Sequence, residues 1–403
     1  MRRLLALVLT AALLVAAPSA PAASGPAPAA RSGASLVVTG YAMVGLRAGV
    51  IRRDAHALDL VGVSSLTILP HARNVERSYA GLRRLARLAH ARGLRAELLV
   101  SNWSAATGDS DSALVSRFLA SAGARSRAAS RLARIARREG WDGLTIDLEA
   151  MHSRDRDHLV RFLRMLRRRL PAPVELSMDI GARTSLASYR RSGFDLRRLA
   201  RVVDRIALMT YDQHGASWSG PGPIGAIPWQ RRTMRVLIAR VPRGMVDLGI
   251  AGYGYTWPST GTGRSLSPRR ARALVAADGA TAIWHRRAAE WSATLSNDTV
   301  LWWSDARSYR RRVRLARALG VHGVALWVLG SADPLPDLLA RGLRGCPGED
   351  PVHPVVGGLR ARGQLCGRVP AAAARPRGLA GVHRALLQPH RVRRLAGAAA
   401  HRP

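Results

Sequence analysis

The chain has 403 residues, 47% of them hydrophobic, which is enough for a sizeable core in one large domain or two medium ones. It carries 63 Lys and Arg, all of them Arg, against 26 Asp and Glu, for a formal net charge of +37. This charge suits an anionic polymer such as a cell wall, a membrane surface or nucleic acid, although compositional bias toward solvated Arg explains it equally well. Two cysteines cannot form a zinc site alone, and no nucleic-acid recognition motif accompanies the charge, so we expect neither a zinc protein nor a nucleic-acid binder.

The N-terminus has the order of a secretory signal peptide. Arg2 and Arg3 precede the apolar run Leu4–Ala17, and small residues follow from Pro18 to Ser24. The run is shorter than the about 20 apolar residues that a spanning helix needs, so an uncleaved anchor is the weaker alternative. We therefore predict a signal peptide over residues 1–23, a secreted or cell-wall-associated protein, and no membrane span after its removal.

Residues 24–35 are rich in Pro, Ala and Gly and are predicted to be a linker. From residue 36 to 343, short runs of Val, Ile and Leu alternate with Arg-rich amphipathic stretches. The predicted strands are Leu36–Val44, Ser65–Leu69, Arg95–Val100, Gly143–Glu149, Val174–Ile180, Arg205–Tyr211, Val246–Gly252 and Gly323–Leu329.

Helical segments lie between most of these strands. Gly93, Gly140 and Gly320 each follow such a segment, at the position where a helix end favours a left-handed residue. Eight repeats of strand and helix imply a parallel sheet with helical crossovers, and in about 300 residues they predict an α/β fold, the (β/α)8 or TIM barrel. A doubly wound open sheet is the alternative.

Two segments depart from the repeat. Residues 258–299 are too long for one connection, so we predict a small inserted lobe between strands seven and eight. Residues 344–403 are rich in Arg, Ala, Pro and Gly, with little periodicity, and are predicted to be a disordered tail. Cys346 and Cys366 both lie in this tail and could pair after export.

The fourth predicted strand carries the most informative pattern. Its apolar residues are Leu144, Ile146 and Leu148, and its polar residues are Thr145, Asp147 and Glu149. Successive side chains of a strand point to opposite faces, so the apolar face suits the outer helices and the polar face points into the barrel. The two acids then lie at the C-terminal end of the strand, where barrel enzymes place their chemistry.

Asp147 and Glu149 sit about 6–7 Å apart at Cα on one strand face. Two carboxyl groups that close cannot both ionise easily, and one of them can then donate a proton near neutral pH. The alternative is a half-exposed strand whose polar face is simply solvated.

The stretch from Asp142 to Glu149 resembles the Asp-x-x-Asp-x-Asp-x-Glu signature of glycoside hydrolase family 18, the family of chitinases and related N-acetylglucosaminidases. The resemblance implies that Glu149 is the proton donor, that Asp147 orients the substrate acetamido group, and that Asp142 matches the first Asp. Thr145 replaces the middle Asp, which in typical chitinases shares a proton with its neighbour. Thr145 can hydrogen-bond Asp147 but cannot hold charge, so the departure puts the pH profile in doubt.

Three further stretches support the same resemblance, and it covers residues 36–343. Leu208–Gly215 resembles the family's Met-x-Tyr-Asp motif, which implies that Tyr211 donates to the acetamido group and that Asp212 contacts the distorted sugar. Leu248–Trp257 is similar to the strand-seven motif of the branch acting on bacterial peptidoglycan, including spore-germination hydrolases. Ala325–Gly330 is similar to its strand-eight motif, whose Trp, here Trp327, forms the floor under the cleaved sugar.

The resemblance implies a secreted hydrolase that cleaves β-linked N-acetylglucosamine glycans, with peptidoglycan as the expected partner. The substrate's own acetamido oxygen would be the nucleophile, and the anomeric configuration would be retained. A chitinase and a non-catalytic glycan-binding protein on the same barrel are the alternatives. We expect a monomer without a cofactor. We also expect no metal, because no His stands at metal-ligand spacing beside a carboxylate.

Six aromatic residues fall near predicted strand ends and could stack on sugar rings, although each could equally fill the core. They are Tyr41, Trp103, Tyr253, Tyr255, Trp257 and Trp327.

Overall fold

The computed structural model describes residues 35–336. The predicted signal peptide, the linker apart from Ser35, and the predicted tail with Cys346 and Cys366 lie outside the described residues.

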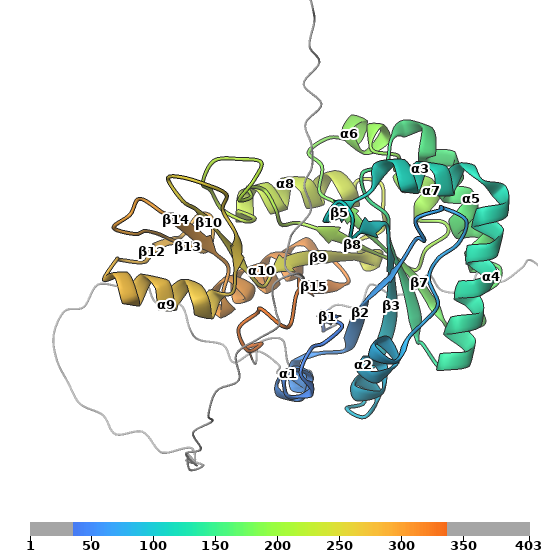
Figure 1. The fold of residues 1–403 in the computed structure, drawn as a ribbon, viewed down its shortest axis with the longest axis horizontal. Helices are drawn as coiled ribbons and strands as arrows, with labels where there is room; N and C mark the ends of the chain where they lie inside the picture. Colours follow the sequence, from blue (N-terminus) through green and yellow to red (C-terminus); the bar gives the residue numbers. More distant parts are fainter. Residues whose placement is uncertain (1–34, 337–403) are drawn as a thin grey trace, which may run out of the picture. The chain divides into compact units, whose positions relative to one another are not determined.

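Eight parallel strands close into a barrel in the order β1-β15-β9-β8-β7-β6-β3-β2 (Figure 1). They are β1 Val37–Met43, β2 Leu60–Thr67, β3 Arg95–Ser101, β6 Gly143–Asp147, β7 Glu175–Gly181, β8 Arg205–Met209, β9 Val246–Ala251 and β15 Gly323–Trp327. The predicted barrel is confirmed and the open sheet is excluded, because β1 pairs with both β2 and β15.

Helices follow the strands around the barrel. They are α1 Ala48–Asp54, α2 Ala80–His90, α3 Ser112–Ala120, α4 Ala122–Glu139, α5 Arg156–Arg167, α6 Leu186–Arg191, α7 Leu196–Leu199, α8 Ile227–Ile238 and α10 Ala306–Leu319, with short 3-10 turns at Ala55–Ala57, Ser153–Asp155 and Arg243–Met245. The predicted left-handed residues are confirmed: Gly140 ends α4 with a φ of 70°, and Gly320 ends α10 with a φ of 62°. No helix among residues 35–336 combines the length and the apolar character needed to span a membrane.

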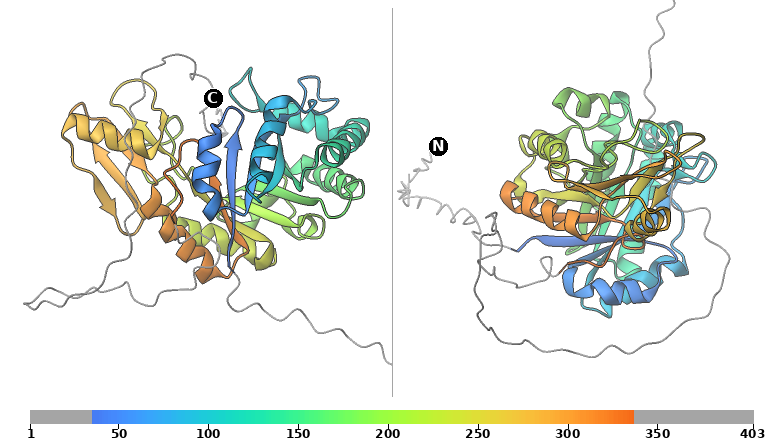
Figure 2. Two further views of the ribbon diagram at one scale, coloured as in Figure 1. Left: turned by 90° about the horizontal axis from the view of Figure 1, so that it is seen from below. Right: turned by 90° about the vertical axis from the view of Figure 1, so that its left-hand side faces the viewer.

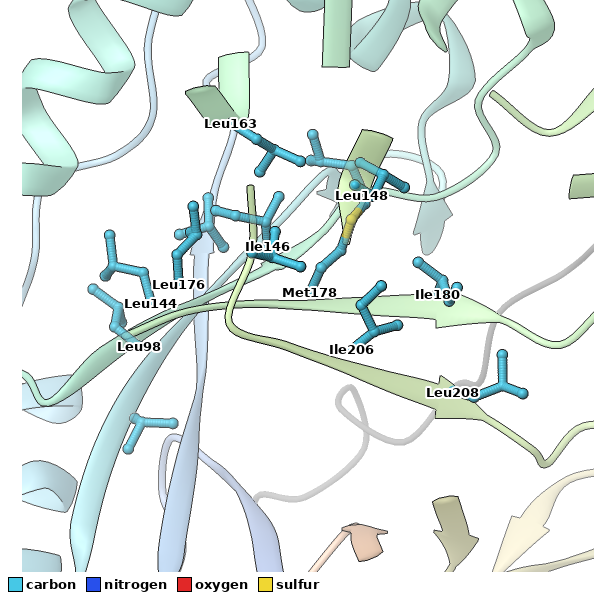
Figure 3. Packing of buried hydrophobic residues seen from close by; sticks show 14 of the residues in the cluster. Leu98, Leu144, Ile146, Leu148, Leu163, Leu176, Met178, Ile180, Ile206 and Leu208 are labelled. Carbon is cyan, nitrogen blue, oxygen red and sulfur yellow. The ribbon is translucent and has the colours of Figure 1, made fainter. Parts of the chain in front are cut away.

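The outer face of the barrel is apolar, as the alternation of the fourth predicted strand requires. Leu144, Ile146 and Leu148 are buried in one large cluster with residues of the neighbouring strands and of the outer helices. Figure 3 shows them packed among Leu176, Met178 and Leu163. Their burial from water is the main driving force that seats α5 on the barrel.

The lower interior of the barrel is polar. Arg205 donates to Glu97 at 2.6 Å and lies 3.0 Å from Asp247, and all three side chains are buried. Burial lowers the pKa of Arg205, but the two carboxylates outweigh burial and raise that pKa above its ordinary value. Thr145 Oγ1 donates to Glu97 at 2.9 Å and lies 2.8 Å from Ser177 Oγ, so its hydroxyl belongs to this network and not, as we expected, to a bond with Asp147.

The second barrel strand begins earlier than the sequence indicates. The predicted strand covers residues 65–69, whereas β2 runs from Leu60 to Thr67. Gly62, in the middle of this strand, interrupts the sequence pattern of a strand. A contact with a neighbouring strand explains why glycine stands there. A Cβ at Gly62 would lie 2.6 Å from Cδ1 of the Tyr41 ring, so only glycine leaves room for that ring.

The predicted insertion between the seventh and eighth barrel strands is confirmed as an antiparallel sheet of order β11-β10-β14-β13-β12. Its elements are β10 Gly254–Trp257, β11 Ser265–Leu266, α9 Pro268–Asp278, β12 Ile283–His285, β13 Glu290–Thr294 and β14 Val300–Trp303. Figure 2 shows this sheet to one side of the barrel strands. It therefore starts at residue 254 and ends at 303, wider at both ends than the predicted 258–299.

Candidate active site

A cavity of about 880 Å³ opens at the C-terminal ends of the barrel strands. Its wall includes the last residues of β3, β6 and β15, which are Ser101, Asp147 and Trp327. Trp103 of the short hairpin formed by β4 (Trp103–Ser104) and β5 (Asp109–Ser110) and Tyr253 after β9 also line it. The described fold therefore gathers polar and aromatic side chains where barrel enzymes carry their chemistry.

Glu149 lies two residues beyond the end of β6 and is held by its backbone. Its N–H donates to Asn102 Oδ1 at 2.8 Å, and Asn102 Nδ2 donates to its carbonyl at 3.1 Å. Ser110 Oγ, from the β4–β5 hairpin, donates to Glu149 Oε2 at 3.2 Å. Asn102 is fully buried, and its two hydrogen bonds fix the main chain of Glu149. The side chain of Glu149 is half-buried.

Tyr211, just after β8, lies near four carboxylates. Burial raises its pKa well above the ordinary value, and the negative charges of Asp179, Asp147, Asp212 and Glu149 raise it further. Tyr211 therefore keeps its phenolic proton and can act as a hydrogen-bond donor. The structure thus brings together three of the predicted residues, Asp147, Glu149 and Tyr211.

Asp212 is fixed by two tyrosines. The hydroxyls of Tyr253 and Tyr255 donate to Asp212 Oδ1 at 2.5 and 2.8 Å. Burial and the charge of Asp212 raise the pKa of both tyrosines well above the ordinary value, so both hydroxyls stay donors. Asp212 itself has a φ of 58°, in the left-handed region, which these bonds help to hold.

Trp327 lines the cavity and is half-buried, which suits a stacking surface under a sugar. Tyr41 lies against it, with ring centroids 5.3 Å apart. Tyr41 is only 3% exposed and its hydroxyl donates to Asp179 Oδ1 at 2.7 Å. The prediction that Tyr41 stacks on substrate is therefore wrong: it supports Trp327 and Asp179 inside the barrel.

The prediction that Asp142 is catalytic is also wrong. It precedes β6 at the opposite, N-terminal end of the barrel, about 16 Å along the strand from Asp147. There its Oδ2 lies 2.8 Å from His90 Nε2 and accepts from the N–H of Ala96 at 2.7 Å. Asp142 joins β6 to β3 and α2, which is a structural task.

Two further predicted sugar-stacking residues, like Tyr41, do not line the cavity. Tyr255 has no exposed surface, and Trp257 is 8% exposed. Trp257 Nε1 donates to the carbonyl of Ser219 at 3.0 Å, which fixes the loop after Tyr211. Both residues support the site from behind, while Trp103 and Tyr253 do lie in the cavity wall.

The sequence interpretation missed Asp179 and Asn102. Asp179 is buried on β7, and burial raises its pKa to about 7, although the Tyr41 bond and Arg205 oppose that shift. It lies on a strand in which Glu175, Ser177 and Asp179 alternate with apolar residues, a signal of the same kind as the alternation on β6. Nothing in the local pattern marks Asn102.

Among residues 35–336, no group of three or more His, Cys, Asp or Glu side chains is arranged to hold a metal ion.

Comparison with known proteins links this geometry to one family. The model of glycosyl hydrolases family 18 matches residues 64–332. YdhD of Bacillus subtilis, named as a sporulation-specific glycosylase, is 31% identical over 199 residues, which cover 47% of each chain. The cortical fragment-lytic enzyme of Bacillus subtilis is 27% identical over 211 residues, or 49% of each chain. The chain thus spans about half the length of these curated relatives.

Solved structures agree on the fold. The spore cortex-lytic enzyme SleL of Bacillus cereus superposes with a TM-score of 0.67 at 20% identity, over 76% of this chain and 74% of that one. A chitinase of Chromobacterium violaceum superposes with a TM-score of 0.65 at 25% identity, over 74% of this chain and 96% of that one.

Proposed function

The chain belongs to family 18 of the glycosyl hydrolases, and we propose that it is a glycosidase that cleaves β-linked N-acetylglucosamine glycans, with peptidoglycan as its substrate. The observation that supports this proposal is that Asp147 and Trp327 line one cavity at the C-terminal ends of the barrel strands, while Tyr211 lies near the charges of Asp147 and Glu149. A glycan-binding protein without activity would not need the main chain of Glu149 held just beyond the strand end by a buried asparagine.

The arrangement supports a substrate-assisted, retaining mechanism. Glu149 donates a proton to the glycosidic oxygen, and the bond from that oxygen to the anomeric carbon breaks. The acetamido oxygen of the same sugar attacks the anomeric carbon and forms an oxazolinium ion. Glu149, now a carboxylate, takes a proton from water, and the hydroxide opens the ring with net retention.

Asp147 and Tyr211 position the internal nucleophile. Asp147 accepts the acetamido N–H, and its negative charge stabilises the positive charge that develops on the oxazolinium ring. Tyr211, kept protonated by its surroundings, donates to the acetamido group. Holding a group that is already attached to the substrate gives a high effective molarity.

Two observations favour peptidoglycan. Curated relatives that match this chain include cortical fragment-lytic enzymes, and a net charge of +37 would concentrate the protein on an anionic wall. Chitin is the second candidate, because the chitinase of Chromobacterium violaceum has the same fold over most of its length. We further propose that the protein is exported through the N-terminal signal sequence.

The test is product analysis by mass spectrometry after incubation with purified peptidoglycan and with chitin oligomers. Wild-type protein is expected to release muropeptides ending in N-acetylglucosamine, and Glu149→Gln to be at least about a hundredfold slower, the usual share of a general acid. Asp142→Asn is the matched control, since it changes the acid just before the same strand, at the opposite end of the barrel, and should turn over at a rate near wild type. Near-wild-type turnover by Glu149→Gln would contradict the mechanism, and cleavage of chitin alone would contradict the choice of substrate.

A further inference from the structure

We propose that Asp147 and Asp179 share a single proton up to near-neutral pH, and that Asp179 is a positioning residue that holds Asp147 in place as the acceptor for the acetamido group. The shared proton is a property of the folded barrel. Only its use in hydrolysis rests on the proposed function.

The sheet register places the two acids side by side. On β6 and β7 the last paired positions are Ile146 and Met178, so the next residues on the two strands, Asp147 and Asp179, continue the pairing. Neighbouring strands lie about 4.8 Å apart, and residues at the same register point to the same face. Both acids follow inward-pointing polar residues, Thr145 and Ser177, whose hydroxyl oxygens lie 2.8 Å apart. The two carboxyl groups therefore enter the barrel as neighbours.

Both side chains are almost removed from water. Asp147 is 5% exposed and Asp179 is 3% exposed. Two negative charges about 5 Å apart repel strongly where water does not screen them, so such a pair keeps one proton over a wide pH range. Burial raises the pKa of Asp179 to about 7, which agrees with a carboxyl group that keeps its proton up to near-neutral pH.

The other groups around Asp179 decide which acid carries the proton. The charged and titratable side chains that face it are Tyr41 from β1, Glu97 from β3, Arg205 from β8, Asp247 from β9, and Tyr211. Tyr41 donates to Asp179 Oδ1, and Arg205 also favours its anion, but Arg205 is already engaged by Glu97 and Asp247. Glu97 and Asp247 themselves favour the protonated form of Asp179. Asp147, nearer the cavity, is left as the anion.

This distribution has a chemical use. A protonated Asp179 donates its O–H to Asp147 and fixes the orientation of that carboxylate, whose other oxygen can then accept the substrate N–H. When Asp179 loses its proton, the bond is replaced by repulsion, and Asp147 loses its fixed orientation. We therefore expect kcat to fall as the pH rises above about 7, the pKa of Asp179.

The decisive experiment is an infrared pH titration of the folded protein without substrate. The C=O stretch of a protonated carboxyl group is followed from about pH 5 to about pH 9, and labelling of aspartate with 13C at its side-chain carboxyl separates Asp from Glu signals. Wild-type protein and Glu149→Gln are expected to lose an aspartic acid band with a midpoint near 7. Asp179→Asn should lack that band, and Asp147→Asn should lower its midpoint by at least about one unit, because the neighbouring charge is gone.

Absence of the band in wild-type protein, or an unchanged midpoint in Asp147→Asn, would overturn the proposal. Activity supplies a second arm. Asp179→Asn keeps a donor that does not titrate, so its kcat should no longer fall above about pH 7, whereas Asp179→Ala should lose about tenfold or more in kcat at every pH. Equal losses in both variants with an unchanged pH profile would reduce Asp179 to a structural role. If neither glycan is cleaved, the proposed function fails, but the infrared titration still decides whether Asp147 and Asp179 share a proton.

Discussion

At the scale of single residues, burial keeps one neighbour in its ordinary protonation state and changes that of the other. It raises the pKa of Tyr211 well above the ordinary value, so a group that is neutral in water stays neutral. It raises the pKa of Asp179 from 3.8 to about 7, so a group that is charged in water becomes neutral in the fold. The site therefore gains one hydrogen-bond donor, from Asp179, that the composition of the chain does not reveal.

The shift of Asp179 predicts a pH dependence of stability. In the unfolded chain this acid ionises near 3.8, and in the folded protein near 7, so between those values the folded state binds more protons. The stabilising contribution of the proton is complete below about pH 4 and is lost as the pH rises through about 7, a change of about 4 kcal/mol.

The measurement is the denaturation midpoint of wild-type protein and of Asp179→Asn at intervals across this pH range. The unfolding free energy of the wild type should decline relative to that of the variant as the pH rises, because the amide does not titrate. Other acids contribute equally to both proteins and cancel in the difference. A difference that is constant with pH would show that Asp179 ionises normally in the fold.

The sequence could predict those site residues whose position follows from the alternation of side chains along one strand. Alternation on one strand pointed to Asp147, which lines the cavity, and to Glu149, which lies just beyond the same strand end. It could not show that Tyr41 faces inward under Trp327, because a ring near a strand end has the same local pattern whether it meets substrate or core. Asn102 escaped notice for a related reason, since its partner is 47 residues away in the chain.

At the scale of elements, the strands were predictable where apolar runs are unbroken, and β2 was not. Its first half contains Gly62, a poor strand former by local criteria. The residue is required by the Tyr41 ring of the neighbouring strand, a contact that the sequence does not show. The β4–β5 hairpin was missed for another reason: strands of two residues carry no periodicity.

Gly62→Ala tests this interpretation of β2. The new Cβ would meet two ring atoms of Tyr41 at 2.6 and 2.7 Å, so the ring or the strand has to move. We expect a loss of about 1–3 kcal/mol in unfolding free energy, the usual cost of overpacking, and a reduced kcat because Tyr41 carries the bond to Asp179.

Gly244→Ala is the matched control, since a Cβ there meets nothing within 4 Å and the backbone is not left-handed. Denaturant unfolding and kcat are measured for both variants. Equal effects at Gly62 and Gly244 would mean that the Tyr41 ring adapts freely, and that the strand does not need glycine.

At the scale of the whole described fold, the insertion has to stay fixed to the barrel for the site to work, because its strand β10 carries Tyr255, one of the two tyrosines that hold Asp212. One buried ion pair contributes to this connection. Glu290 of β13 meets Arg312 of α10 at 2.5 Å, and neither side chain is more than 1% exposed.

The pair also fixes the loop that follows β8. Glu290 accepts the N–H groups of Ile224 and Gly225 at 2.7 and 3.0 Å, and Arg312 donates to the carbonyl of Gly225 at 2.7 Å. Arg312 donates further to the carbonyl of Ala289. Insertion, loop and outer helix thus meet at one pair of charges, and removing either charge leaves the other buried and uncompensated.

Arg312→Met is therefore expected to cost about 3–5 kcal/mol in unfolding free energy, measured by denaturant unfolding. Arg272→Met is the control: it removes an Arg bonded to Asp333 at 2.7 Å, but one that is 48% exposed, and such surface pairs contribute about 1 kcal/mol or less. Adding Glu290→Gln to Arg312→Met should recover part of the loss, because the amide removes the unpaired charge and still accepts one of the loop N–H groups. If Arg312→Met cost no more than Arg272→Met, the packing of the insertion alone would have to hold it on the barrel, and the buried pair would have no role in positioning Asp212.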